Sequence, residues 1–153
     1  MPTSQEIYME QALALAREAA VAGEVPVGCV IVRNGEVVGR GRNRREEKQA
    51  TSSHAEMEAI AQANAALGTW RLDDCELYVT LEPCPMCAGA IVQARLARVV
   101  YGAADPRQGC AGSVYRVTED PAFTHFCPAD GGVLEKECRA VLDEFFKNAR
   151  QGR

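Results

Sequence analysis

Two short motifs in this 153-residue chain hold residues of the types that bind metal ions and move protons. His54 and Glu56 form a His-x-Glu motif, and Cys84 and Cys87 form a Pro-Cys-x-x-Cys motif further along the chain. Two thiolates and one imidazole suit tetrahedral Zn²⁺ and leave its fourth position open for water. A carboxylate two residues from the histidine can move protons to and from that water. The spacing predicts a catalytic zinc site in which the histidine and both cysteines are ligands and Glu56 is the acid/base.

The chemistry expected of such a site is hydrolytic removal of an amino group from a heterocyclic base. Zinc lowers the pKa of its bound water toward about 7. Glu56 would take that proton, protonate a ring nitrogen as hydroxide attacks, and then protonate the departing amine. In this scheme the two cysteines hold the metal and are not nucleophiles.

Each motif also has a simpler explanation. A Cys-x-x-Cys pair can be half of a structural zinc site or a redox pair, but no second pair has this spacing, and redox chemistry leaves His54 and Glu56 idle. Ser53 and Glu56 match a capping box, in which the carboxylate only satisfies a backbone N–H. Glu82 is expected to be a solvated carboxylate or one at a helix N-terminus.

The remaining cysteines are expected to be reduced structural thiols. Seven cysteines are an odd number, and those outside the Pro-Cys-x-x-Cys motif are scattered singly, as expected in a reducing cytosol. They are Cys29, Cys75, Cys110, Cys127 and Cys138. If Cys110 or Cys127 filled the fourth zinc position, the chain would instead be a non-catalytic zinc-stabilised subunit or RNA-binding module.

Hydrophobic periodicity and turn signals predict an α/β fold. A capping box begins the first helix at Thr3 and Glu6, and Asn34-Gly35 is a strong hairpin signal. The expected helices are 3–22, 54–67, 85–94 and 134–149, and the expected strands are 27–32, 36–42, 77–80 and 99–101.

The strand–helix–strand unit around the cysteine motif requires a crossover, which makes its two strands parallel neighbours and gives a mixed sheet with helices on both faces. Sites in such sheets form at the carboxyl ends of strands, where residues 81–87 fall. Residues 103–130 are rich in Gly, Pro and Asp and receive no assigned structure.

Composition is that of an ordinary globular domain, with 47% hydrophobic and 25% charged residues. No apolar run approaches the roughly 20 residues of a membrane span, and no secretory signal pattern is present, so we expect a cytoplasmic protein. The net charge of −4 argues mildly against a general nucleic-acid binder. Basic residues gather in 40–48 and 147–153, and the acidic excess, such as Glu6, Glu18 and Glu24 of the first helix, is expected on a solvated face.

Further segments carry a more specific pattern. They are Gly-Glu-Val-Pro-Val-Gly at 23–28, Asn43-Arg44, Thr-Leu-Glu-Pro-Cys-Pro-Met-Cys-Ala-Gly-Ala at 80–90, Gly102-Ala103, Asp105-Pro106, Gly109, Gly112-Ser113 and Phe145-Phe146. His-x-Glu followed by Pro-Cys-x-x-Cys is the established signature of zinc-dependent base deaminases. Over nearly its whole length the chain resembles the bacterial tRNA-specific adenosine deaminases of the cytidine/deoxycytidylate deaminase superfamily.

The resemblance implies a three-layer α/β/α sandwich with a central mixed five-stranded sheet, formed by one zinc-dependent deaminase domain over residues 1–153. It implies one Zn²⁺ per subunit, a homodimer, and conversion of the wobble adenosine in the anticodon loop of an arginine tRNA to inosine. It implies that Asn43 contacts the flipped-out base and that Asp105 lies near the sugar-phosphate chain. Residues implied to wall the base pocket are Pro26, Val27 and Leu81, and plausible phosphate contacts are Arg42, Arg44, Arg45, Lys147 and Arg150.

Other interpretations stay open for these positions. Taken alone, Asn43 suits a strand-end turn and Asp105 a turn before Pro106. Residues 50–53 (Ala-Thr-Ser-Ser) replace the usual Pro-Thr-Ala of the family, which affects substrate detail and leaves the reaction class unchanged. His125 is expected to be a structural hydrogen-bonding residue. The alternative function is deamination of a free base or nucleoside such as guanine or cytosine, which the acidic composition favours and the flanking motifs disfavour.

Overall fold

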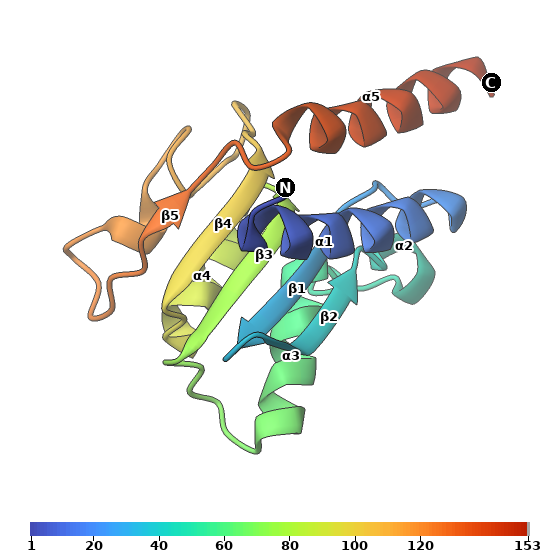
Figure 1. Ribbon diagram of the computed structural model, residues 1–153. Coiled ribbons are helices and arrows are strands. Elements are labelled where there is room, and N and C mark those ends of the chain that lie inside the picture. Colours follow the sequence, from blue (N-terminus) through green and yellow to red (C-terminus); the bar gives the residue numbers. More distant parts are fainter. Residues whose placement is uncertain (153) are drawn as a thin grey trace.

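The computed structural model describes residues 1–152, in which a five-stranded sheet lies between two layers of helices (Figure 1). The strands are β1 (Gly28–Arg33), β2 (Glu36–Arg42), β3 (Cys75–Leu81), β4 (Arg98–Ala103) and β5 (Ala129–Asp130). The helices are α1 (Ser4–Val21), α2 (Arg45–Lys48), α3 (Ala55–Leu67), α4 (Pro85–Ala94) and α5 (Glu135–Gln151), with a 3₁₀ turn η1 (Val117–Glu119).

The sheet is mixed, with strand order β2-β1-β3-β4-β5. Strand β1 is antiparallel to both β2 and β3, whereas β3, β4 and β5 are mutually parallel neighbours. The α4 crossover connects β3 to β4, as the strand–helix–strand pattern predicted. The expected three-layer α/β/α sandwich with a mixed five-stranded sheet is therefore confirmed.

Successive side chains of the central strands enter opposite cores, because a strand alternates its faces. On one face, Ile31, Leu77 and Val79 pack with residues of α3 and α4. On the other face, Val30 and Tyr78 pack with residues of α1 and α5. Figure 1 shows the two helix pairs on opposite sides of the sheet. The β3 strand is covered on both faces, which explains its nearly continuous burial.

Local sequence signals account for several of these boundaries. The Thr3 hydroxyl accepts the Glu6 amide at 3.1 Å, and a Glu6 carboxylate oxygen accepts the Thr3 amide at 2.8 Å, so the predicted capping box is confirmed. Asn34 and Gly35 both have positive φ, at 49° and 79°, as a tight hairpin between twisted strands requires. Helix α2 and strand β5 were not predicted; β5 lies in the stretch without assigned structure.

The seven cysteines are all free thiols, and the five outside the motif are buried, as expected. Within residues 1–152, no helix combines the length and the apolar character that a membrane crossing requires.

Helix α3 lies unusually close to β2 because glycine occupies the contact. A Cβ atom on Gly41 would lie 2.2 Å from the Ala55 carbonyl oxygen and 2.7 Å from the Ala59 amide nitrogen. Neither backbone atom can retreat without moving the helix. Because Ala55 directly follows His54, this contact also sets where the first turn of α3 lies relative to the sheet.

Gly41→Ala is expected to lower the free energy of unfolding by about 2 kcal/mol or more, since overpacking a close backbone contact forces α3 away from the sheet. Chemical denaturation measures this change. The matched control is Gly89→Ala in α4, where an added Cβ meets nothing within 4 Å and alanine is the better helix former. A loss at Gly41 no larger than the change at Gly89 would contradict the packing argument.

Candidate functional site

The two predicted motifs meet where two helices begin. His54 is the N-cap of α3 and Cys84 is the N-cap of α4, with Pro85 at the first helical position. Neither side chain makes a capping hydrogen bond, so the amides and the positive dipole of both first turns remain directed toward the ligand atoms. Cys87 follows in the first turn of α4. This placement favours thiolates, the form of cysteine that binds metal.

The side chains of His54, Cys84 and Cys87 form a compact ligand set. The Nδ1 atom of His54 lies 3.6 Å from each sulfur, and all three ligand atoms lie within 4.8 Å of one another. Tetrahedral bonds of about 2.3 Å to sulfur and about 2.05 Å to nitrogen separate those atoms by about 3.6 Å. The donor set and its spacing therefore fit Zn²⁺.

The cluster supplies three protein ligands. Among the described residues, neither Cys110 nor Cys127 joins it, so the fourth ligand proposed for a closed structural site is not found. The Sγ atom of Cys110 instead donates to the carbonyl of Gln108 at 3.4 Å. Three ligands with an open position are the arrangement of a catalytic zinc site.

The electrostatics of the cluster favour one thiolate. Hydrogen bonds from Cys87 and then from His54 lower the pKa of Cys84 to about 4. The bond to Cys84 together with burial raises the pKa of the Cys87 thiol well above its usual range, because its proton is held against the sulfur of Cys84. The thiolate of Cys84 in turn raises the pKa of His54. The site is thus prepared to receive a cation.

Glu56 lies in the first turn of α3, beside the ligand cluster, and is only 4% exposed. Burial raises the pKa of its carboxyl to about 7, a value suited to taking and returning a proton near neutral pH. The capping-box explanation of Ser53 and Glu56 is wrong, because the N-cap of α3 is His54 and no side chain caps it. The carboxylate is therefore not used to end the helix.

Four of the five expected substrate residues lie around one edge of the sheet, and the fifth is in the adjoining loop. Leu81 ends β3, Asp105 follows β4, and Val27 precedes β1, where its carbonyl accepts the amide of Asn43 at 3.1 Å. Pro26 is buried beside Val27. These are the strand ends that flank the start of α3 and α4, so the structure brings the predicted residues to the same region as the metal ligands. Their roles toward substrate stay predictions.

Two of these side chains organise their own loops. Asn43 is 8% exposed; its Nδ2 donates to Val25 O at 3.2 Å, and its Oδ1 accepts the amide of Arg45 at 3.0 Å. Asp105 Oδ1 accepts the amides of Arg107 and Gln108 at 3.0 and 3.4 Å. The turn-forming interpretations therefore hold alongside any contact with substrate.

Glu82 is not the solvated carboxylate that the sequence suggested. It is 2% exposed, and its oxygens accept the amides of Asp105 and Ala111, both at 3.0 Å, and of Ser113 at 2.9 Å, together with the Ser113 hydroxyl. Burial alone would raise the pKa of Glu82, but these hydrogen bonds lower it. The loop that carries Asp105 is thus wrapped around a carboxylate at the end of β3.

Glu24 also departs from the expected solvated acidic face. Helix α1 ends at Val21, and Glu24 beyond it is 1% exposed, with its oxygens on the amides of Glu46 and Glu47 in α2. No pattern in the chain pointed to either buried carboxylate, because the N–H donors come from distant segments. His125, by contrast, lies as expected, with Nε2 2.7 Å from the carbonyl oxygen of Leu96.

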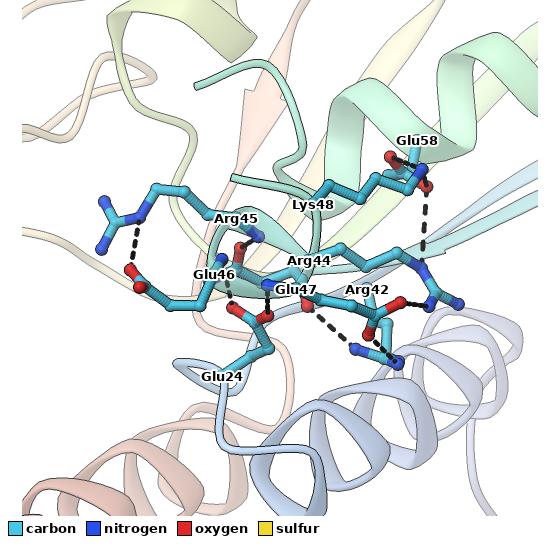
Figure 2. Close-up of polar contacts among 9 residues, drawn as sticks. Glu24, Arg42, Arg44, Arg45, Glu46, Glu47, Lys48 and Glu58 are labelled. Carbon is cyan, nitrogen blue, oxygen red and sulfur yellow. Dashed lines mark hydrogen bonds and ion pairs between the residues drawn. The ribbon is translucent and has the colours of Figure 1, made fainter. Parts of the chain in front are cut away.

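The basic residues at 42–48 are paired with carboxylates (Figure 2). Glu47 lies 2.9 Å from both Arg42 and Arg44, and this lowers the pKa of its carboxyl. Glu58, one turn after the start of α3, lies 2.9 Å from Lys48. The predicted phosphate contacts in this segment are therefore ordered on the protein surface rather than extended into solvent.

Comparison with known proteins connects this geometry to a family. Residues 3–150 match the model of the MafB19-like deaminases. The chain is 48% identical over 149 residues to the tRNA-specific adenosine deaminase of Bacillus subtilis (strain 168), covering 97% of this chain and 92% of that protein. A solved structure from a study of A-to-I editing by tRNA:A34 deaminases superposes with a TM-score of 0.85 at 44% identity, over 88% of this chain and 98% of that one.

Structural similarity extends to a deaminase of a free base, but less completely. The guanine deaminase of Bacillus subtilis gives a TM-score of 0.62 at 42% identity, over 65% of this chain and 64% of that one. The shared part is consistent with a common metal core. The longer and closer match lies with the protein from the tRNA study.

Glu82→Ala is expected to lower the free energy of unfolding by about 3 kcal/mol, because several buried amides of the 105–113 loop lose their acceptor. Glu36→Ala, which removes an exposed carboxylate from the β1–β2 hairpin, is the matched control and should stay within about 0.5 kcal/mol of the original protein. Denaturant titrations compare the two. Equal, small changes would refute the anchoring role of Glu82.

Proposed function

Because the chain belongs to the MafB19-like deaminases and, among them, to the tRNA-specific adenosine deaminases, we propose that it converts the wobble adenosine of an arginine tRNA to inosine. The observation that carries the proposal is the meeting of three metal-type ligands with a buried, protonatable carboxyl at two helix starts. The proposal also includes a single zinc-dependent deaminase domain over residues 1–153. A tRNA substrate would place the enzyme in the cytoplasm.

We propose that His54, Cys84 and Cys87 hold one Zn²⁺ per chain. The support is the donor chemistry, two sulfurs and one imidazole nitrogen at separations that suit a tetrahedral ion. When bound, Zn²⁺ supplies a Lewis acid that makes water nucleophilic near neutral pH.

Glu56 supplies the proton transfers in this proposal. It takes one proton from the attacking water and delivers it to the ring nitrogen N1 as the C6–O bond forms. It then takes the remaining hydroxyl proton and delivers it to the amino group as the C6–N bond breaks. One water is consumed and one ammonia released, which leaves the 6-oxo base of inosine. A carboxyl with a pKa near 7 can act in both directions.

An RNA loop is favoured over a free base by the surroundings of the site. A looped base is already unpaired, so extruding it costs little, and loops are recognised through splayed bases and phosphate contacts. Arg44 and Arg45 begin the segment beside the site and could meet phosphates. Asn43, Pro26, Val27 and Leu81 are proposed around the base, and Asp105 near the sugar-phosphate chain. We further propose that the enzyme acts as a homodimer, as implied for this family.

The first test is inosine formation on the anticodon stem-loop of an arginine tRNA, with adenosine, guanine and cytosine as parallel substrates. Only the stem-loop should react, and its KM should rise several-fold between about 50 and 200 mM salt because phosphate contacts release counterions. A neutral free base should show almost no salt effect. Reaction with guanine or cytosine alone would replace the tRNA proposal with the free-base alternative.

Glu56→Ala is expected to reduce the rate of inosine formation at least about 100-fold, because the transition states lose their acid/base. The variant should still bind one zinc per chain and the RNA with wild-type affinity, measured by elemental analysis and fluorescence anisotropy. Cys87→Ser is the contrasting variant and should lose zinc and activity together. Robust activity of Glu56→Ala would remove Glu56 from the mechanism.

A further inference from the structure

Glu24 is a buried carboxylate that the proposed chemistry does not use. It follows α1, where its amide donates to the carbonyl of Ala19 at 2.9 Å, and its side chain crosses to α2. Its oxygens accept the amides of Glu46 at 3.1 Å and Glu47 at 2.7 Å (Figure 2). A buried carboxylate costs free energy unless hydrogen bonds compensate it. The compensation here comes from the first turn of α2, so Glu24 binds α2 to the end of α1.

The capped segment is joined directly to the metal-ligand cluster. We call residues 43–48 the rim turn. The amide of Arg44 donates to the carbonyl of Ser53 at 2.9 Å, and Ser53 immediately precedes the ligand His54. The Asn43 side chain holds the start of the rim turn through the carbonyl of Val25 and the amide of Arg45. The rim turn is thus fixed at its base by Asn43 and in its middle by Glu24.

The cap also orders the charged side chains of the rim turn. The backbone N–H of Glu47 is held by Glu24, while its carboxylate pairs with Arg42 and Arg44 at 2.9 Å. Figure 2 shows these contacts side by side, with Glu47 between the two arginines and the buried Glu24. If the amide of Glu47 were released, the carboxylate that orients both guanidinium groups would lose its fixed position.

We infer that Glu24 is a positioning residue for RNA: by capping α2 it holds Arg44 and Arg45 in the orientation in which they meet substrate phosphates. The inference rests on the proposed function, in which these arginines bind an anticodon loop. Side chains that are already ordered lose less conformational freedom on binding. Loss of the cap therefore weakens RNA binding more than it slows the chemical step.

The sign of the effect separates positioning from simple charge. Glu24→Gln keeps the size of the side chain, but its NH₂ group must face one of the two amides it formerly accepted. It also removes a negative charge near a surface for a polyanion, which by Coulomb attraction alone would tighten RNA binding. Positioning predicts the opposite. The matched control is Glu46→Gln, the same charge change in the same turn, since this carboxylate is 66% exposed and only 3.7 Å from Arg45.

We expect Glu24→Gln to raise KM and the dissociation constant for the anticodon stem-loop about ten-fold, the effect of one charge-assisted hydrogen bond. Its kcat at saturating RNA should change less than about two-fold. Glu46→Gln should bind RNA as tightly as the original protein or more tightly. Binding by Glu24→Gln equal to that of Glu46→Gln would overturn the inference. So would a fall in kcat that follows zinc content or thermal stability without a change in KM.

Hydrogen exchange of the Glu46 and Glu47 amides gives a reading that does not need a substrate. Exchange should be faster in Glu24→Gln than in Glu46→Gln, and equal rates would refute the cap itself. If the original protein fails to deaminate RNA while this difference is present, the proposed function fails and the local role of Glu24 stands. If Glu24→Gln does not fold, Glu24→Asp, which keeps the charge and shortens the reach, carries the same expectations.

Discussion

The separation of 3.6 Å between the nitrogen of His54 and each of two sulfurs is the constraint on which the rest of the structure depends. A shift of one helix start by an ångström would remove a ligand from a tetrahedral ion. The two starts belong to different helices on the same face of the sheet. Gly41 lets α3 lie directly on β2, and the short connection from Leu81 ties α4 to the end of β3. The sheet thus serves as the ruler for the metal ligands.

Three buried carboxylates surround this site, and their environments differ in a way that separates their roles. Glu24 and Glu82 each accept backbone amides from a neighbouring loop, which compensates their burial. In Glu56 burial dominates, and its pKa rises to about 7. The pKa of Glu82 is lowered instead. Carboxyls whose environments move their pKa values apart are divided between proton transfer and structure. Glu56 is the one suited to move protons.

Sequence patterns were sufficient where structure is local. The capping box, the Asn34-Gly35 hairpin and the Pro85 helix start each depend on a few adjacent residues, and the crossover rule then placed β3 beside β4. The metal-type ligands were found because their spacing is itself the signal. Glu24 and Glu82 were missed because their amide donors lie 22 to 31 residues away in the chain, and a short carboxylate-capped turn has no periodicity.

The paired charges beside the site explain how an acidic protein could still bind RNA. Arg42, Arg44 and Lys48 are matched locally by Glu47 and Glu58, so this segment projects little long-range positive field. Attraction would then act only at contact, where a phosphate competes with a carboxylate for guanidinium groups already in place. Exposed ion pairs contribute little stability, which makes such exchange inexpensive. Recognition of this kind depends on the exact position of the loop phosphates more than on net charge, and it favours a substrate of defined shape over nucleic acid in general.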